Sequence, residues 1–187
     1  LVHDSEKEAF AAQIATMGPG TTLLVDTYDI TEGVNNAVAA AREAGGELGA
    51  VRLDSGDLVA QAFTVRKQLD DLGATSTKIT VTSDLDEYSI AALGAAPVDS
   101  YGVGTRLVTG SGHPTAEMVY KLVQREGADG KMHEVAKSSQ NKASVGGLKV
   151  AGRVCDQRGS AAQELVVSAG SWQEGLDYLE RAGARPL

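Results

Sequence analysis

The sequence predicts an α/β protein in which parallel strand–helix units are followed by an antiparallel β addition. Apolar, β-branched runs alternate with helical patterns at a repeat of roughly 25 to 30 residues, and each run ends in polar residues. From about Glu117 the pattern changes to short strands separated by glycine-containing turns. Strands joined by helices form parallel sheets, whereas strands joined by tight turns pair antiparallel.

Composition limits the classes of function. The 187 residues suffice for one domain with a core, or for one domain and a small appendage. A net charge of −8 argues against nucleic-acid binding by phosphate neutralisation. The single cysteine, Cys155, excludes an internal disulfide and a cysteine zinc site. No apolar run approaches the roughly 20 residues of a membrane span. We expect a cytoplasmic protein that binds neither nucleic acid nor membrane.

The first two strand–helix units follow a capped helix. Ser5 and the acidic residues after it predict a helix start, and Gly18-Pro19-Gly20 ends this helix. The strands are continuous apolar runs, and the helices carry small apolar residues on one side before glycine stops. The predicted elements are helix 4–17, strand 21–25, helix 31–44, strand 50–53 and helix 57–72.

The same order then repeats and ends in the antiparallel part. We predict strand 78–82, helix 87–93 and strand 100–103, then a hairpin of 118–125 and 133–137, strands 149–155 and 164–167, helix 173–182 and a frayed end at 184–187. The predicted domains are a βα-barrel portion, 1–116, and an antiparallel β/α appendage packed on it, 117–187.

The strand tip Arg52-Leu-Asp54-Ser-Gly-Asp57 is the first candidate site. Arg52 offers a planar set of donors and Asp54 offers carboxylate oxygens, at positions where a buried strand should still be apolar. Asp57 is better explained as the cap of the following helix. Asp26, Asp29 and Asp84 lie at other strand tips. With Asp54 they could hold Mg²⁺ that bridges phosphates, although one or two of them should only cap helices.

A second candidate is Gly102-Val-Gly104-Thr105 with the adjacent Arg106. Exposed N–H groups at a strand end can bind an anion, but a tight turn explains the glycines equally well. His3, His113 and His133 lack partners at metal-ligand spacing. The basic, polar stretch 137–149 could contact a phosphate or another subunit, and a solvated loop is its simplest interpretation.

Four motifs in this order resemble nicotinate phosphoribosyltransferase. They are Val25-Asp-Thr-Tyr-Asp29, Val51-Arg-Leu-Asp-Ser-Gly-Asp-Leu58, Thr82-Ser-Asp-Leu-Asp-Glu87 and Tyr101-Gly-Val-Gly-Thr-Arg-Leu107. Val119-Tyr-Lys-Leu-Val123 and the stretch that ends in Gly-Gly-Leu-Lys149 are similar to the C-terminal part of that family. The similarity covers about Leu23 to Lys149.

The resemblance implies a fold and a reaction. The fold would be part of the irregular (β/α) barrel of type II phosphoribosyltransferases with the antiparallel appendage. The enzyme, a pentosyltransferase and ligase of NAD salvage, would join nicotinate to phosphoribosyl pyrophosphate, assisted by ATP through a phosphohistidine. Mg²⁺ and a homodimer are also implied. Alternatives are a nicotinamide or quinolinate phosphoribosyltransferase, another barrel enzyme that binds a phosphorylated sugar, or a non-catalytic remnant that serves oligomerisation or regulation.

The resemblance also implies roles for residues. Arg52 would contact the pyridine or its phosphoribosyl partner, and Asp54 the ribose hydroxyls. Asp26 would lie near the metal and pyrophosphate, Ser83 and Asp84 near the ribose, and Gly104 and Thr105 at the 5′-phosphate. The family's Gly-Thr-x-x-His segment with the phosphorylated histidine is absent. We therefore expect roughly the C-terminal half of the enzyme, inactive by itself.

Overall fold

The computed structural model describes residues 2–110, 112, 115–116, 118–139 and 143–187. His113 and residues 140–142 of the basic stretch lie outside the described residues. The chain divides into two compact units. Unit 1 comprises Leu1–Tyr120 and Lys137–Ala143, and unit 2 comprises Lys121–Ala136 and Ser144–Leu187. The sequence-based boundary at residue 116 stays a prediction.

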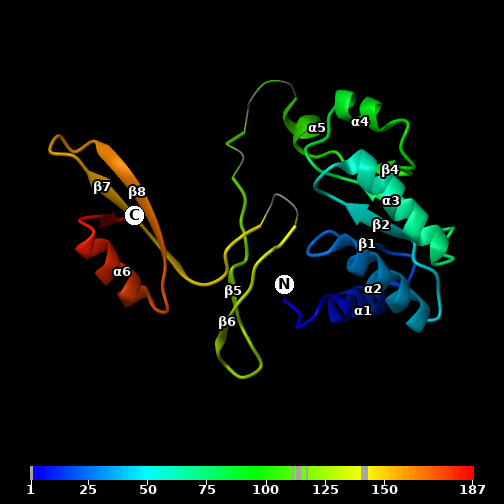
Figure 1. The fold of residues 1–187 in the computed structure, drawn as a ribbon, viewed down its shortest axis with the longest axis horizontal. Coiled ribbons are helices and arrows are strands. Elements are labelled where there is room, and N and C mark those ends of the chain that lie inside the picture. Colours follow the sequence, from blue (N-terminus) through cyan, green and yellow to red (C-terminus); the bar gives the residue numbers. More distant parts are fainter. Residues whose placement is uncertain (1, 111, 113–114, 117, 140–142) are drawn as a thin grey trace. The chain divides into compact units, whose positions relative to one another are not determined.

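Unit 1 is built on a four-stranded parallel sheet in the order β1-β2-β3-β4 (Figure 1). Right-handed crossovers between neighbouring parallel strands place the connecting helices on one face of the sheet. The strands are β1 (Thr22–Leu24), β2 (Ala50–Leu53), β3 (Lys78–Val81) and β4 (Ser100–Tyr101). The helices are α1 (Glu6–Met17), α2 (Ile30–Glu43), α3 (Leu58–Asp71), α4 (Glu87–Leu93) and α5 (Thr105–Thr109).

The two faces of this sheet differ in polarity. Leu23, Val51 and Ile79 are fully buried on the face that carries the core, with helix residues such as Val34 and Val65. Strand side chains alternate between faces, so their neighbours point the other way. Leu24, Arg52, Thr80 and Ser100 form one register row on that second face. This row is therefore apolar at β1 and polar at the other three strands.

Unit 2 is antiparallel. Strands β5 (Gln124–Glu126) and β6 (Met132–Glu134) form a hairpin, and β7 (Lys149–Cys155) pairs with β8 (Ala161–Ser168) and β9 (Arg185–Pro186). Helix α6 (Trp172–Arg181) contributes Leu179 to a small core with Val150 and Ala184.

The mixed α/β class, with a parallel sheet followed by antiparallel strands, is confirmed. The first strand of the hairpin begins at Gln124 and not at residue 118 as predicted. Two elements were not predicted: the short helix α5 after Gly104, and β9 within the expected frayed end. Both are shorter than the windows in which periodicity can be recognised. Among the described residues, no helix has the length and apolar character needed to cross a membrane.

Close packing of α2 on β1 predicts an unusual glycine effect. A Cβ at Gly33 would lie 2.3 Å from the Val25 carbonyl oxygen, whereas a Cβ at Gly20 would contact nothing within 4 Å. Alanine within a helix normally stabilises it by up to about 1 kcal/mol relative to glycine. We expect Gly33→Ala instead to lower the free energy of unfolding by about 1–3 kcal/mol through overpacking. Urea unfolding checks this against Gly20→Ala, and equal stability of the two variants would contradict it.

Candidate functional site

The candidate residues lie at the carboxyl ends of the four parallel strands of unit 1. Parallel strands present these ends at the same edge, where open α/β sheets and barrels place their sites. The edge contains Asp26 after β1, Asp54 after β2, Thr82 and Ser83 after β3, and Gly102 after β4.

Asp26 connects the carboxyl ends of β1 and β2, which are the first two strand tips. Its side chain is buried, and its Oδ2 accepts hydrogen bonds from the Asp54 backbone N–H at 3.0 Å and from Ser55 Oγ at 2.6 Å. Its Oδ1 is also buried and has no hydrogen-bond partner among the described residues. Hydrogen bonds to an ionised acceptor are stronger than those between neutral groups. Asp26 therefore fixes the backbone from which Asp54 projects.

Asp54 connects the second and third tips. Its Oδ1 accepts a hydrogen bond from Thr82 Oγ1 at 2.5 Å and lies 3.9 Å from Nη2 of Arg52. The Asp54 and Arg52 side chains are 26% and 42% exposed. The Arg52 Nε has no hydrogen-bond partner among the described residues. Arg52 and Asp54 thus lie together, accessible to a small polar ligand.

The third tip has a strained backbone. Ser83 adopts φ 134°, a conformation that L-residues rarely occupy. Strain of this kind often accompanies ligand sites. Asp84 is exposed. Asp86 caps α4 through a capping box with Ser89, and these hydrogen bonds hold the pKa of Asp86 below its usual value of 3.8.

The fourth tip is the most open. Gly102 passes close to Thr82, because an added Cβ would lie 2.5 Å from Thr82 Cγ2. Gly104 caps α5 without any side-chain hydrogen bond to the helix N-terminus. Thr105 and Arg106 are exposed, and Arg106 Nη1 donates to the Gly112 carbonyl at 3.3 Å. Steric contact with Thr82 thus explains why residue 102 is a glycine. It does not explain the glycine at position 104, where an added Cβ would contact nothing within 4 Å.

Two aspartates serve as helix caps. Asp57 accepts from the Ala60 N–H at 3.1 Å, and Asp29 accepts from the Glu32 N–H at 2.9 Å. The capping role predicted for Asp57 is confirmed. No group of three or more His, Cys, Asp or Glu side chains that could hold a metal ion occurs among the described residues. The aspartates of the tips therefore do not form such a site by themselves.

Sequence reasoning missed Ser139. This buried residue lies in the part of the basic stretch that belongs to unit 1, and its Oγ donates to the Asp26 carbonyl. A serine in a polar stretch carries no signal of burial. The contact joins residues 113 positions apart, so no local pattern could have revealed it.

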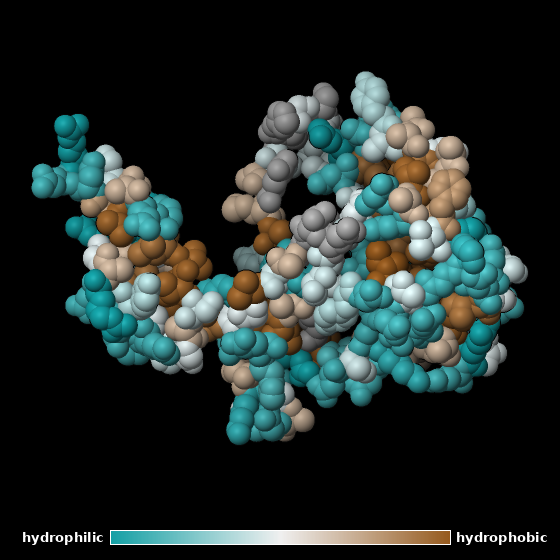
Figure 2. Space-filling model, viewed as in Figure 1, coloured by the Kyte–Doolittle hydropathy of each residue, from teal (hydrophilic) through white to brown (hydrophobic). Residues whose placement is uncertain are grey.

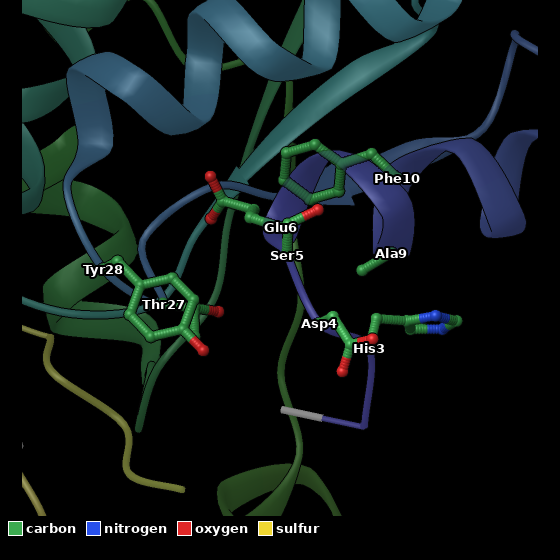
Figure 3. Close-up of a pocket in the computed structure, with 8 residues that line it drawn as sticks. All are labelled: His3, Asp4, Ser5, Glu6, Ala9, Phe10, Thr27 and Tyr28. Carbon is green, nitrogen blue, oxygen red and sulfur yellow. The ribbon is translucent and has the colours of Figure 1, made fainter. Parts of the chain in front are cut away.

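A pocket of about 200 Å³ lies beside the first tip, between the start of α1 and the loop after β1 (Figure 3). Burial raises the pKa of Glu6 above its ordinary value of 4.5, while a hydrogen bond from Asn36 partly opposes the shift, and the nearby Asp29 and Glu32 add to it. In Figure 3 the His3 ring points away from Tyr28. The lining residues are His3, Asp4, Ser5, Glu6, Ala9, Phe10, Thr27 and Tyr28.

The chain is similar to known nicotinate phosphoribosyltransferases. "Nicotinate phosphoribosyltransferase pncB1" of Mycobacterium tuberculosis is 59% identical over 166 residues, which cover 89% of this chain and 35% of that protein. The Bacillus subtilis enzyme is 43% identical over 72% of this chain and 29% of its own length. The human enzyme is 33% identical over 88% of this chain and 32% of its own length. The chain thus spans about a third of these relatives.

A solved structure agrees in fold. Nicotinate phosphoribosyltransferase from Porphyromonas gingivalis has a TM-score of 0.52 and 18% identity, over 95% of this chain and 46% of that one. No protein-family profile matches the chain.

The environment of Glu6 predicts a pH dependence of stability. A raised pKa means that the folded state binds the proton more tightly, so stability decreases as pH rises from about 4.5 through the folded pKa. Glu6→Gln has no carboxyl group at this position and therefore no such decrease in stability. The difference between its melting temperature and that of the wild type should increase as the pH rises from about 4 to neutrality. Thermal melts at several pH values test this. Glu8→Gln, at an exposed position of the same helical turn, is the control, and parallel curves for both variants would contradict the assignment.

The strain at Ser83 predicts that glycine stabilises this tip. Relief of an unfavourable φ is worth about 1–3 kcal/mol, against a cost of about 0.5–1 kcal/mol for the greater freedom of glycine in the unfolded chain. Ser83→Gly should therefore raise the free energy of unfolding, whereas Ser83→Ala, which retains a Cβ, should not. Denaturant unfolding of both variants measures the difference. A glycine variant no more stable than the alanine variant would show that no strain is relieved.

Proposed function

Because this chain belongs to the nicotinate phosphoribosyltransferase family and matches its C-terminal portion, we propose that the protein containing it transfers a phosphoribosyl group to nicotinate. Phosphoribosyl pyrophosphate is the donor, and the products are nicotinate mononucleotide and pyrophosphate, as in NAD salvage. The observation that carries the proposal is the pairing of Arg52 with Asp54 at the edge of the sheet, in a chain 59% identical to a protein of that name.

The proposed chemistry needs orientation and charge more than proton transfer. When the bond between ribose C1 and the pyrophosphate oxygen breaks, positive charge develops on the sugar and negative charge on the leaving group. The pyridine nitrogen attacks with its own lone pair and requires no general base. Asp54, held by Thr82 and by the hydrogen bond that its backbone N–H donates to Asp26, would align the ribose hydroxyls. Arg52 would contact the pyridine or its phosphoribosyl partner.

The remaining tips would bind the phosphoribosyl group. Ser83 and Asp84 would lie near the ribose. Gly104 and Thr105 would offer N–H groups to the 5′-phosphate, with Gly102 and Arg106 adjacent to them. The exposed backbone of Gly104, which has no side-chain cap, supports this assignment.

Magnesium would be held mainly by the phosphates of the substrate. Mg²⁺ is commonly bound by one or two carboxylates and substrate phosphates, and it would supply charge neutralisation of the leaving group. From this chain the oxygen that fits such a role is the buried Oδ1 of Asp26, for which the described residues supply no hydrogen-bond partner. For ATP we assign no phosphorylated histidine here, because the sequence has no Gly-Thr-x-x-His segment.

We also propose that unit 1 is part of a type II phosphoribosyltransferase barrel. The sequential strand order supports this, because a closed barrel adds each strand beside the previous one. Figure 2 shows apolar residues, in brown, at the surface. The exposed large side chains of unit 1 include Leu107 and Val108, which are 78% and 83% exposed, and Tyr120, and such a surface supports a homodimer. The single cysteine is consistent with a cytoplasmic location.

The function is tested with the full-length protein. Pyrophosphate release is measured with Mg²⁺, ATP, phosphoribosyl pyrophosphate and, in parallel, nicotinate, nicotinamide or quinolinate. We expect turnover with nicotinate, and preference for another pyridine would overturn the proposal.

Within that enzyme, Asp54→Asn should lower kcat/KM about 100-fold or more, the scale expected when a reacting group loses its orientation. The amide oxygen can still accept from Thr82, so the melting temperature should change little. Asp57→Asn, which conserves the helix cap, is the matched control and should retain activity. If Asp54→Asn lost stability and rate in proportion, the role of Asp54 would be structural.

A further inference from the structure

The segment Lys137–Ser139 contacts the first strand tip. Ser139 is 3% exposed, and its Oγ donates to the Asp26 carbonyl and, at 3.4 Å, to the Thr27 carbonyl. The Ser138 backbone N–H donates to the same Thr27 carbonyl at 3.2 Å. These bonds hold the main chain at the start of the loop between β1 and α2, whereas the Asp26 carboxylate contacts Asp54 and Ser55.

The backbone hydrogen bonds of β1 with β2 end at the start of this loop. The register of β1 with β2 ends at Leu24, and the last bond between these strands runs from the Val25 N–H to the Arg52 carbonyl at 3.2 Å. Beyond it the Asp26 carbonyl accepts from Ser139 Oγ, and the Thr27 carbonyl accepts from Ser139 Oγ and the Ser138 N–H; within the part of the chain that the structure describes, no backbone N–H of β2 donates to either. Ser139 supplies the hydrogen bond that a buried carbonyl requires.

The contacts continue from Ser139 to the candidate site. Ser139 fixes the Asp26 main chain, the Asp26 carboxylate fixes the Asp54 N–H and Ser55 Oγ, and Asp54 accepts from Thr82. A shift of the Asp26 main chain would move its carboxylate and thereby the position of Asp54. Displacements of about 1 Å in a positioned group can cost two orders of magnitude in rate.

We propose that Ser139 is a positioning residue for the phosphoribosyl pyrophosphate side of the site. The inference rests on the proposed function, in which Asp54 orients the ribose. Ser139 touches no substrate and acts through Asp26. Its loss should therefore weaken the use of phosphoribosyl pyrophosphate more than that of nicotinate.

The test compares Ser139→Ala with Ser138→Ala in the full-length enzyme. Ser138 is exposed and contributes its backbone N–H, which alanine retains. Steady-state rates are measured with each substrate varied, well below the melting temperature of each variant. We expect Ser139→Ala to lower kcat/KM for phosphoribosyl pyrophosphate about tenfold and to change the nicotinate KM less than twofold, while Ser138→Ala matches the wild type.

A second variant separates positioning from folding. Ser139→Cys has a similar shape, but its thiol is a weaker donor. It should show the same selective defect. Unchanged parameters for phosphoribosyl pyrophosphate in the alanine and cysteine variants, or equal losses for both substrates, would overturn the proposal. An inactive wild-type enzyme would instead refute the proposed function.

Discussion

The structure of the candidate site depends on the buried carboxylate of Asp26. A buried carboxylate is costly unless it accepts hydrogen bonds, and this one accepts from the backbone and a hydroxyl of the neighbouring tip. The same bonds hold Asp54 where Thr82 and Arg52 approach it. Three successive strand ends are thereby connected by short polar contacts, so a change at one tip is transmitted to the next.

The sheet separates apolar and polar side chains by face. Fully buried aliphatic side chains such as Leu23, Val51 and Ile79 pack on the helix side. On the opposite side the row of Arg52 also contains Thr80 and Ser100, whose hydroxyls lie 2.8 Å apart. Because strand side chains alternate with a period of two, the core can remain apolar while this row stays polar. Substitutions in the polar row can therefore occur without changing the apolar core on the other face.

Much of the local structure followed from the sequence, because its causes are local. Strand β2 and helix α4 have the predicted bounds, and the cap formed by Asp57 was recognised from its position before a helix. The contact of Ser139 with Asp26 could not be predicted, because it depends on the return of a distant segment. The φ angle of Ser83 was also missed, because serine, unlike glycine, does not indicate a left-handed backbone.

Each of the two units is made of two separate segments of the chain, so neither can be exchanged as one continuous piece. The backbone leaves unit 1 after Tyr120, returns for Lys137–Ala143 and leaves again at Ser144. A recombination event that exchanged everything after residue 120 would also remove the serine that holds the loop after β1. Unit 2 therefore cannot be replaced by recombination at a single junction. Evolutionary changes in its hairpin must allow the chain to return to unit 1 at Lys137.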